Sequence, residues 1–250
     1  MSGTPITIVG NYASPYVRKV LVCLDLKGIP YQIDPIIPFF GNDEFSRLNP
    51  VRRIPLLIDG DVVLPDSTVI CEYLEERFPG VSLYPNTLEQ RAKARWLEEY
   101  ADSCMGEIFI WRLFGEVINK RYIWRQETDD AVVQKALTQE IPDILNYLEK
   151  QLPAEDYLFE SISVADIAIA TFFRNAELVQ FRVDATRWPI TAAFVDRLLN
   201  FPSFVRLRKF EEIIMTMPLA QQRESLKAAG APIADKSFGT TTPRKGILSV

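Results

Sequence analysis

Residues 49–79 read NPVRRIPLLIDGDVVLPDSTVICEYLEERFP, and this stretch decides the fold. The apolar run at 54–58 predicts a strand, and the Asp-Gly pair after it is typical of a two-residue hairpin turn. Residues 61–64 predict the returning strand. A Pro-Asp-Ser sequence then favours a helix start, so we expect a helix over 67–78 that ends before the next Pro-Gly pair.

Upstream of this stretch, strand and helix patterns alternate. Residues 6–9 (ITIV) predict a strand, and PYVRKVLVCLDL at 15–26 carries apolar side chains at helical spacing. Ser14 precedes the proline that opens this helix, in the position of an N-cap residue. Residues 31–37 predict a second strand, and NDEFSRLNP predicts a short, weak helix. The first 80 residues therefore predict the order β-α-β-α-β-β-α.

Downstream, the pattern changes to helical periodicity alone, after a proline-containing linker at 81–88. Helices are expected near 89–119, 127–151, 163–180, 187–200 and 202–216. We therefore expect an α+β protein with an α/β domain at 1–80 and an all-α domain at 89–222. The tail at 223–250 contains Gly, Thr and Pro residues that predict no regular structure.

The composition is that of an ordinary globular protein. Of the 250 residues, 48% are hydrophobic and 24% are charged, and the net charge of −5 argues against a nucleic-acid-binding protein. No apolar run approaches the ~20 residues that span a bilayer. The first residues also lack the pattern of a secretory signal. We therefore expect a soluble, cytoplasmic protein that binds neither membranes nor nucleic acid.

The chain contains no histidine, and this excludes several kinds of active site. Ser-His-Asp and Cys-His catalysis and histidine-ligated metal sites cannot be built, and we expect no metal. Three cysteines, Cys23, Cys71 and Cys104, lie in apolar segments without a CxxC pair, so we expect reduced thiols. An enzyme with this composition would need another acid–base group or a cofactor with its own reactive atom.

Three segments together resemble the signatures of cytosolic glutathione S-transferases. They are ASPYVRKVLVCLDLKGIPY at 13–31, the stretch at 49–79, and SISVADIAIA at 161–170. The resemblance is to serine-type classes, and it covers residues 6–80 well and the helical half more loosely. It implies a thioredoxin-like domain that binds glutathione, followed by an all-α domain that holds the co-substrate and takes part in a homodimer.

The resemblance implies a catalytic role for Ser14. A free thiol with a pKa of about 8.5 is mostly protonated at neutral pH, whereas conjugation needs the thiolate. The Ser14 hydroxyl and the positive end of its helix would stabilise that thiolate. Two alternatives stay open: Ser14 is only an N-cap, or Tyr12 supplies the hydroxyl. Position 14 holds no cysteine, which disfavours a thiol-exchange reductase.

The loop before the hairpin is implied to bind the glutathione backbone. The Ile54–Pro55 bond is expected to be cis, with the Ile54 backbone pairing with the cysteinyl residue in the manner of an added strand. Arg53 is implied to contact the glycyl carboxylate. Arg52 stands where relatives often have glycine, so the shape of this loop is left open.

The helix start at 66–67 is implied to hold the γ-glutamyl end. Ser67 and the free N–H groups around it suit the α-carboxylate, and Asp66 suits the ammonium group. Both residue types also favour helix starts, which is the simpler interpretation. In the all-α half, Ser163 and Asp166 have the spacing of a structural capping box.

Aromatic residues in the all-α half are candidates for the wall of a co-substrate pocket, although most such residues are core. They are Phe109, Trp111, Phe114, Tyr122 and Trp124, with Met105 beside them. The leading expectation is a transferase that conjugates glutathione to a small hydrophobic electrophile. The alternatives are a glutathione-dependent reductase or peroxidase, an aryl-ether-cleaving transferase, and a non-catalytic glutathione S-transferase-like binding protein.

Overall fold

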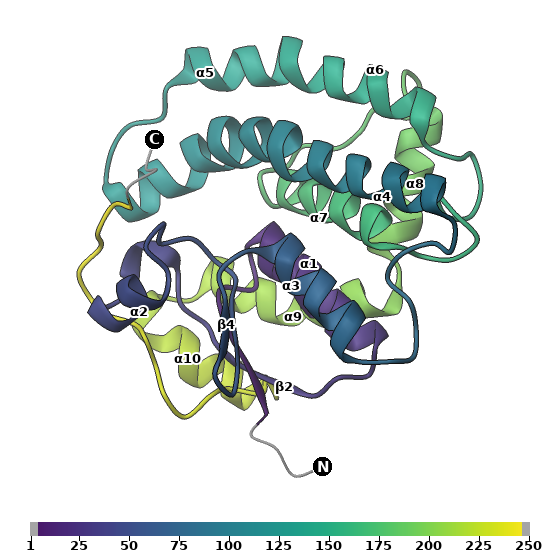
Figure 1. The fold of residues 1–250 in the computed structure, drawn as a ribbon. Coiled ribbons are helices and arrows are strands. Elements are labelled where there is room, and N and C mark those ends of the chain that lie inside the picture. Colours follow the sequence, from purple (N-terminus) through teal and green to yellow (C-terminus); the bar gives the residue numbers. More distant parts are fainter. Residues whose placement is uncertain (1–4, 247–250) are drawn as a thin grey trace. The chain divides into compact units, whose positions relative to one another are not determined.

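The computed structural model describes residues 5–246, which divide into two compact units (Figure 1). The first unit combines the chain up to Val81 with the chain from Pro202 onward, and the second is Ser82–Phe201. This division differs from the expected one. The sequence predicts residues 202–222 to be part of the all-α domain, whereas their contacts in the structure group them with the α/β part.

A four-stranded mixed sheet forms the centre of the first unit, in the order β2-β1-β3-β4. The strands are β1 (Ile6–Val9), β2 (Tyr31–Asp34), β3 (Leu56–Asp59) and β4 (Val62–Leu64). β1 pairs with β2 in parallel and with β3 antiparallel, and β3 and β4 form the predicted hairpin. This is the thioredoxin-like arrangement that the sequence predicts. The second strand ends at Asp34, earlier than expected, because a proline follows it.

Two helices of the first unit carry the predicted site residues. α1 (Pro15–Leu26) is the crossover between the two parallel strands, and α3 (Ser67–Arg77) follows the hairpin and packs against α1. Pro15 occupies the first turn of α1, where a missing N–H costs nothing. The remaining helices are η1 (Pro38–Phe40), α2 (Asp43–Leu48), α9 (Pro202–Thr216) and α10 (Leu219–Ala228).

A buried ion pair ties α9 to α1. Arg18 Nε donates to Glu211 Oε1 at 2.5 Å, and both side chains are almost completely inaccessible. The Arg18 guanidinium also donates to the carbonyl of Tyr12 at 3.4 Å. Removing either charge alone would leave the other buried without compensation. This pair explains why the helices after Phe201 belong to the α/β unit, which periodicity alone could not show.

The tail also differs from the expectation. Residues 219–228 form helix α10, and residues 229–246 lie against the sheet and α2 with two isolated bridges, Ile33–Ile233 and Gly41–Gly239. The Gly, Thr and Pro content correctly predicts the lack of further long elements. It does not reveal the apolar side chains that the segment buries, Ala231, Ala234 and Phe238.

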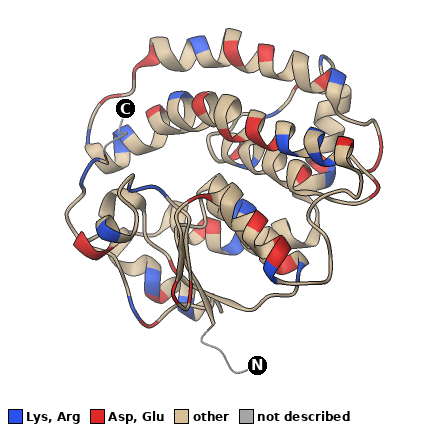
Figure 2. Ribbon diagram, in the orientation of Figure 1, with Lys and Arg blue, Asp and Glu red and all other residues tan. Residues whose placement is uncertain are grey.

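The second unit is helical throughout its regular structure. Its elements are α4 (Leu88–Tyr100), the π-helical η2 (Ala101–Trp124), α5 (Asp130–Lys135), η3 (Ala136–Glu140), α6 (Ile141–Gln151), α7 (Val164–Leu178) and α8 (Pro189–Leu199). The helices expected at 89–119 and 127–151 correspond to α4 with η2 and to α5 through α6. Acidic and basic residues are interspersed along α5 and α6 (Figure 2).

Helix α7 is the buried centre of the second unit, and the predicted capping box begins it. Asp166 is completely buried and accepts hydrogen bonds from the amides of Ser163 and Leu158, both at 2.8 Å. The Ser163 hydroxyl donates to the same carboxylate at 2.6 Å. Burial raises the pKa of Asp166 above its ordinary value, and these hydrogen bonds oppose that rise.

Across residues 5–246, no helix combines the length and the apolar character that crossing a membrane requires.

Candidate functional site

Ser14 begins α1 and is the most exposed of the four residues that form the turn before the helix. Its amide donates to the carbonyl of Asn11 at 3.0 Å, and the Asn11 side chain accepts from the Ala13 amide at 2.9 Å. The Ser14 Oγ accepts from the Val17 amide at 3.4 Å, so Ser14 is an N-cap as the sequence predicts. A hydroxyl that accepts one hydrogen bond still has its own hydrogen to donate.

The start of α1 favours an anion. Its first turn contains no Asp or Glu, so no acid of the helix itself offsets the positive end of this 12-residue helix. A thiolate placed at Ser14 would therefore meet both a hydroxyl donor and the helix field.

Tyr12 is turned into the core. Its side chain is fully buried, and its ring centroid lies 4.8 Å from that of Phe210. Burial, and secondarily the nearby Tyr31, raise the pKa of Tyr12 far above its ordinary value. Burial also raises the pKa of Tyr31 to about 12. This position gives the Tyr12 hydroxyl no exposed atom with which to meet a thiol, so Ser14 is the better candidate.

The loop at 49–55 contains the cis bond that the family resemblance implies. The Ile54–Pro55 bond is cis, which confirms the expectation at this bond. The registered pairing of β1 with β3 ends at Val9 and Leu56, so Ile54 lies two residues beyond the ladder. The side chain of Ile54 is only 9% exposed.

Gly10 brings this loop close to the start of α1. A Cβ atom at Gly10 would lie 2.5 Å from Val17 Cγ2 and 3.5 Å from Ile54 Cβ. Only a residue without a side chain therefore fits between the first turn of α1 and the cis-proline loop. Gly10 is not among the residues predicted for the site, although a glycine directly after a predicted strand often marks a place where another segment approaches the backbone closely.

The two arginines of the loop have different environments. Arg52 has a positive φ of 52°, so it adopts a left-handed conformation that glycine adopts most easily. Its guanidinium donates to the Gly41 carbonyl at 2.9 Å and also to the Ser46 hydroxyl. Arg53 is exposed, and its carbonyl accepts from Asn49 Nδ2 at 2.6 Å. Arg52 is therefore built into the loop, whereas Arg53 lies at the surface.

Asp66 and Ser67 begin α3. The Asp66 Oδ1 accepts from the amides of Thr68 and Val69 at 2.9 and 3.1 Å, so Asp66 is the N-cap. Ser67 is the first helical residue, and it is 4% exposed. The capping role expected for both residue types is present at Asp66, and the carboxylate remains exposed at the surface.

Lys19 is a further candidate site residue, which the sequence patterns did not indicate. It is fully buried, and its ammonium group donates to Thr68 Oγ1 at 3.1 Å. A positive charge from α1 therefore lies beside the first turn of α3, where it adds to the helix field. The available signal is that Arg18 and Lys19 are the only charged residues between Pro15 and Leu24.

The predicted aromatic candidates of the second unit separate into core and surface. Met105 and Phe109 are fully buried, and the Phe109 ring centroid lies 5.3 Å from that of Phe173. Tyr122 is 57% exposed. Phe109 is therefore a core residue, as most aromatic residues in helices are.

A cavity of about 370 Å³ opens on the second unit, and none of those candidates lines it. Its lining includes Leu137, Ile141, Leu145, Phe181 and Trp188, together with Arg182 and Arg187. The Trp188 indole donates to Asn146 Oδ1 at 2.9 Å, which fixes its ring. Sequence periodicity places these residues on helices but does not show that they surround one space.

Within residues 5–246, no cluster of Cys, Asp and Glu has a geometry that could hold a metal ion. The three cysteines are free thiols, and Cys23 and Cys71 face each other with 3.6 Å between their sulfur atoms.

Comparison with known proteins gives matches in both units. Residues 9–82 match the family model "Glutathione S-transferase, N-terminal domain", and residues 110–202 match "Glutathione S-transferase, C-terminal domain".

Similar proteins extend along most of the chain. A maleylacetoacetate isomerase of Rattus norvegicus is 32% identical over 212 residues, which are 81% of this chain and 91% of that protein. A glutathione S-transferase of Triticum aestivum is 24% identical over 200 residues, 79% of this chain and 90% of that protein. A solved glutathione S-transferase of Methylobacillus flagellatus with glutathione bound is 27% identical, with a TM-score of 0.66 over 81% of this chain and 98% of that one.

These matches agree with the thioredoxin-like sheet and the helical second unit. The model of the N-terminal domain matches the α/β part of the chain, and the model of the C-terminal domain matches the helical part that follows it. The chain belongs to the cytosolic glutathione S-transferase family.

Proposed function

We propose that this protein is a glutathione-dependent enzyme that binds glutathione on its first unit and ionises the thiol with Ser14. The observation that carries the proposal is the start of α1, where a serine hydroxyl lies at a helix end whose first turn contains no Asp or Glu. Both features favour an anion, and the reactive anion of glutathione is its thiolate. The solved glutathione S-transferase of Methylobacillus flagellatus, which has glutathione bound, supports the choice of co-substrate.

The rest of glutathione is proposed to bind on either side of Ser14. The backbone of Ile54 would pair with the cysteinyl residue, because it lies where the β1–β3 ladder has ended. The N-terminus of α3 at Ser67, with the Lys19 ammonium behind it, would hold the γ-glutamyl carboxylate. Asp66 would face the γ-glutamyl ammonium, and Arg53 the glycyl carboxylate.

The reaction proposed is nucleophilic attack by the thiolate on a small hydrophobic electrophile. A carbon–sulfur bond forms, and either a leaving group departs with its electron pair or an activated double bond takes up a proton. The chain has no histidine, so a thiolate formed before attack removes the need for a histidine base.

Isomerisation is a second candidate, and the names of relatives favour it. Three proteins called maleylacetoacetate isomerase, each 31–32% identical, align with 75–81% of this chain. A thiolate that adds to an activated cis double bond and is then eliminated would isomerise that bond without net conjugation. The same Ser14 chemistry therefore serves both reactions.

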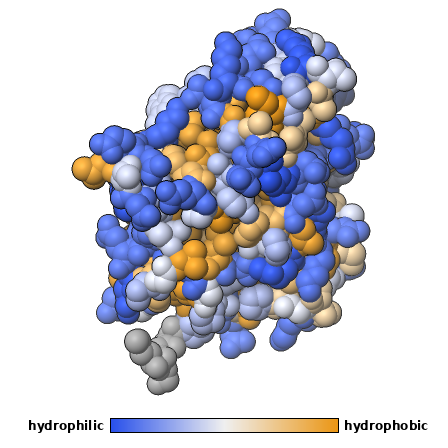
Figure 3. Space-filling model, turned by 90° about the vertical axis from the view of Figure 1, so that its right-hand side faces the viewer, coloured by the Kyte–Doolittle hydropathy of each residue, from blue (hydrophilic) through white to orange (hydrophobic). Residues whose placement is uncertain are grey.

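The expected homodimer and cytoplasmic location are part of the proposal. β4 and α3 expose Val62 and Val69 by 36% and 45%, and Figure 3 shows apolar surface between hydrophilic residues on one face. Apolar surface of this kind suits contact with a second copy. The three free thiols fit a reducing compartment, where glutathione is available. Analytical ultracentrifugation that gives a monomer would contradict the dimer.

The decisive experiment compares the wild type with Ser14→Ala. Glutathione is titrated into each protein while heat of binding and thiolate ultraviolet absorbance are followed. We expect the wild type to bind glutathione and ionise its thiol below the free pKa of about 8.5. Ser14→Ala is expected to bind glutathione but to leave it mostly protonated.

Thr87→Ala is the matched control, because Thr87 caps α4 through the Gln90 amide without belonging to the proposed site. Both variants lose an N-cap, at about 1 kcal/mol of stability. Equal ionisation in wild type and Ser14→Ala would show that Ser14 is only a cap. Failure of the wild type to bind glutathione would favour the non-catalytic binding protein.

Product analysis then distinguishes the two reactions. An activated aryl halide reports conjugation through the released halide, and a cis-configured unsaturated dicarboxylate reports isomerisation without consumption of glutathione. Activity toward hydroperoxides or aryl ethers would instead support the remaining alternatives.

A further inference from the structure

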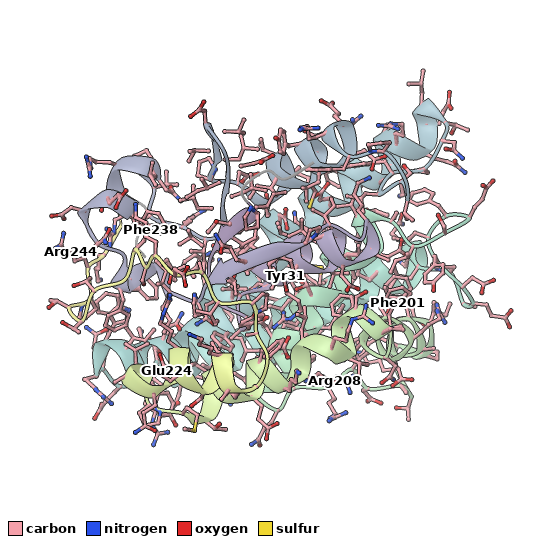
Figure 4. All side chains as sticks on the ribbon, turned by 90° about the horizontal axis from the view of Figure 1, so that it is seen from below. Tyr31, Phe201, Arg208, Glu224, Phe238 and Arg244 are labelled. Atoms are coloured by element: carbon pink, nitrogen blue, oxygen red, sulfur yellow. The ribbon has the colours of Figure 1, made fainter. Side chains whose placement is uncertain are left out.

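The residues after α10 form a long tether along the first unit, which we call the strap (residues 231–246). It covers the free edge of β2, the outermost strand of the sheet. The Ile33 amide donates to the Pro232 carbonyl at 2.7 Å, and the Ala234 amide donates to the Ile33 carbonyl at 2.9 Å. Figure 4 shows the strap in yellow running from α10, where Glu224 is labelled, to Phe238 and Arg244.

A buried carboxylate anchors the strap. Asp34 is completely buried, and it accepts from the Phe238 amide and from Arg223 Nη1, both at 2.7 Å. Both donors come from the C-terminal part of the chain. Only the Phe238 amide belongs to the strap itself, and loss of its bond to a buried carboxylate costs free energy, so the docked strap is favoured. The Phe238 side chain is 4% exposed and adds apolar burial.

Beyond Phe238, the strap binds the segment that contains η1 and the start of α2. The Asn42 amide donates to the Phe238 carbonyl, the Thr240 amide to the Phe40 carbonyl, and the Arg244 amide to the Phe39 carbonyl, each at 2.7 Å. Asn42 is the N-cap of α2. The strap therefore fixes the segment at 38–42 through its backbone.

Arg52 also binds this segment, through its side chain. Its guanidinium donates to the carbonyl of Gly41 at 2.9 Å and lies 5.8 Å from the centre of the Phe45 ring. The strap also approaches the loop directly, since a Cβ at Gly246 would lie 2.9 Å from the Val51 carbonyl oxygen and 3.3 Å from Arg52 Cβ. Strap, segment 38–46 and loop 49–54 are thus one connected layer.

We propose that the strap is part of the glutathione site, because it holds loop 49–54 in its binding shape through Arg52. Arg52 is then a positioning residue that acts through the loop rather than on glutathione. The proposal rests on the proposed function only in naming glutathione as the ligand. The strap is absent from the sequence signatures at 13–31 and 49–79, so the site would extend to the far end of the chain.

The test uses two full-length variants with different defects. Phe238→Ala removes the apolar anchor of the strap. Arg52→Gly removes the guanidinium, while glycine keeps the positive φ that the loop requires. Asp235→Asn is the matched control, because Asp235 is an exposed residue of the strap whose backbone carbonyl, not its side chain, accepts the bond from Arg223 Nη2 at 3.5 Å. Circular dichroism and the unfolding midpoint identify any variant that does not fold.

The first readout is hydrogen exchange at the amides of 49–54 in the protein without glutathione. We expect exchange about tenfold faster in Phe238→Ala and Arg52→Gly, and unchanged in Asp235→Asn, because local opening controls exchange. Unchanged exchange in both folded variants would overturn the proposal. This outcome does not depend on whether the protein binds glutathione.

The second readout is glutathione binding. If the competent loop falls to about a tenth of the population, the apparent Kd rises about tenfold. The thiol of the glutathione that does bind should be ionised as in the wild type, because Ser14 and α1 are unchanged. Faster loop exchange with an unchanged Kd would overturn the link between the strap and glutathione. A wild type that binds no glutathione would instead refute the proposed function.

Discussion

Ser14 and Ser163 are both serine N-caps, but their hydroxyls have different surroundings. Ser163 is 2% exposed, and its hydroxyl donates to the Asp166 carboxylate at 2.6 Å. Ser14 is half-buried, its Oγ accepts one long bond from Val17, and among the described residues no acceptor takes its hydroxyl hydrogen. A neighbouring acid makes one serine structural, and the lack of one leaves the other available for an anion.

A third helix start shows how strongly such a position favours an anion. The carboxylate of Glu149 accepts from the amides of Ile190 and Thr191 at 2.9 and 2.8 Å, at the beginning of α8. Burial raises the pKa of Glu149, but the hydrogen bonds from Thr191 and Ile190 outweigh burial and hold it below its ordinary value. The protein therefore already stabilises one anion at a helix N-terminus.

The largest expected effect comes from breaking the structural cap. Asp166→Ala leaves the buried donors of Ser163 and Leu158 without an acceptor, at about 1–3 kcal/mol each. We expect the free energy of unfolding to fall by about 3–5 kcal/mol in urea denaturation. Glu155→Ala, at an exposed acid of the same unit, should change it little. A loss below about 1 kcal/mol would contradict the structural role.

The next effect concerns the serine proposed to be catalytic. Ser14→Ala should lower turnover with an activated electrophile about 10²-fold or more, as removal of one donor from a developing anion does in other enzymes. Its stability should fall by only about 1 kcal/mol, the value of a cap. A variant that loses stability and keeps its turnover would make Ser14 resemble Ser163. Stopped-flow kinetics with denaturation of the same samples decides between them.

Ser163→Ala should give the converse result on a smaller scale. The variant loses one hydrogen bond to Asp166, so we expect a stability loss of about 1 kcal/mol. Ionisation of bound glutathione should equal that of the wild type, since Ser163 lies in the second unit. A raised thiol pKa in this variant would show that the contrast between the two serines is false.

The smallest expected effect tests Glu149 by pH. A lowered folded pKa means that its stabilisation is present above the unfolded pKa of about 4.3 and is lost as pH falls through the folded pKa. The stability difference between wild type and Glu149→Gln should therefore shrink as the pH is lowered from 6 to 3. Glu160→Gln, at an exposed loop position, serves as the control. A difference that grows on acidification would contradict the hydrogen-bond assignment.

Much of the first unit could be predicted because its signals are local. Proline and serine at the start of α1 and the Asp-Gly turn between β3 and β4 depend on backbone preferences of adjacent residues. The cis bond before Pro55 came from family resemblance rather than from any local preference. The roles of Ser14, Arg53, Ile54, Asp66 and Ser67 toward glutathione remain predictions.

The parts that could not be predicted depend on distant pairing. Tyr12 lies only two residues before Ser14 in the sequence, but its ring packs on Phe210 from α9. The sequence does not give the shape of the loop at Arg52, because the partners of its side chain lie on residues 38–46. The sequence does not indicate Lys19 either, because only folding brings its ammonium group to the first turn of α3.

The sequence by itself determined the strands and helices of the α/β half, the positions of the caps and the exclusion of histidine chemistry, because these follow from local conformation and residue type. Only the tertiary structure decided that α9, α10 and the strap belong with that half. Helical periodicity shows that a face will be buried but not against what. The Arg18–Glu211 pair and the Asp34 anchor show what these segments pack against, because they join residues about 200 positions apart.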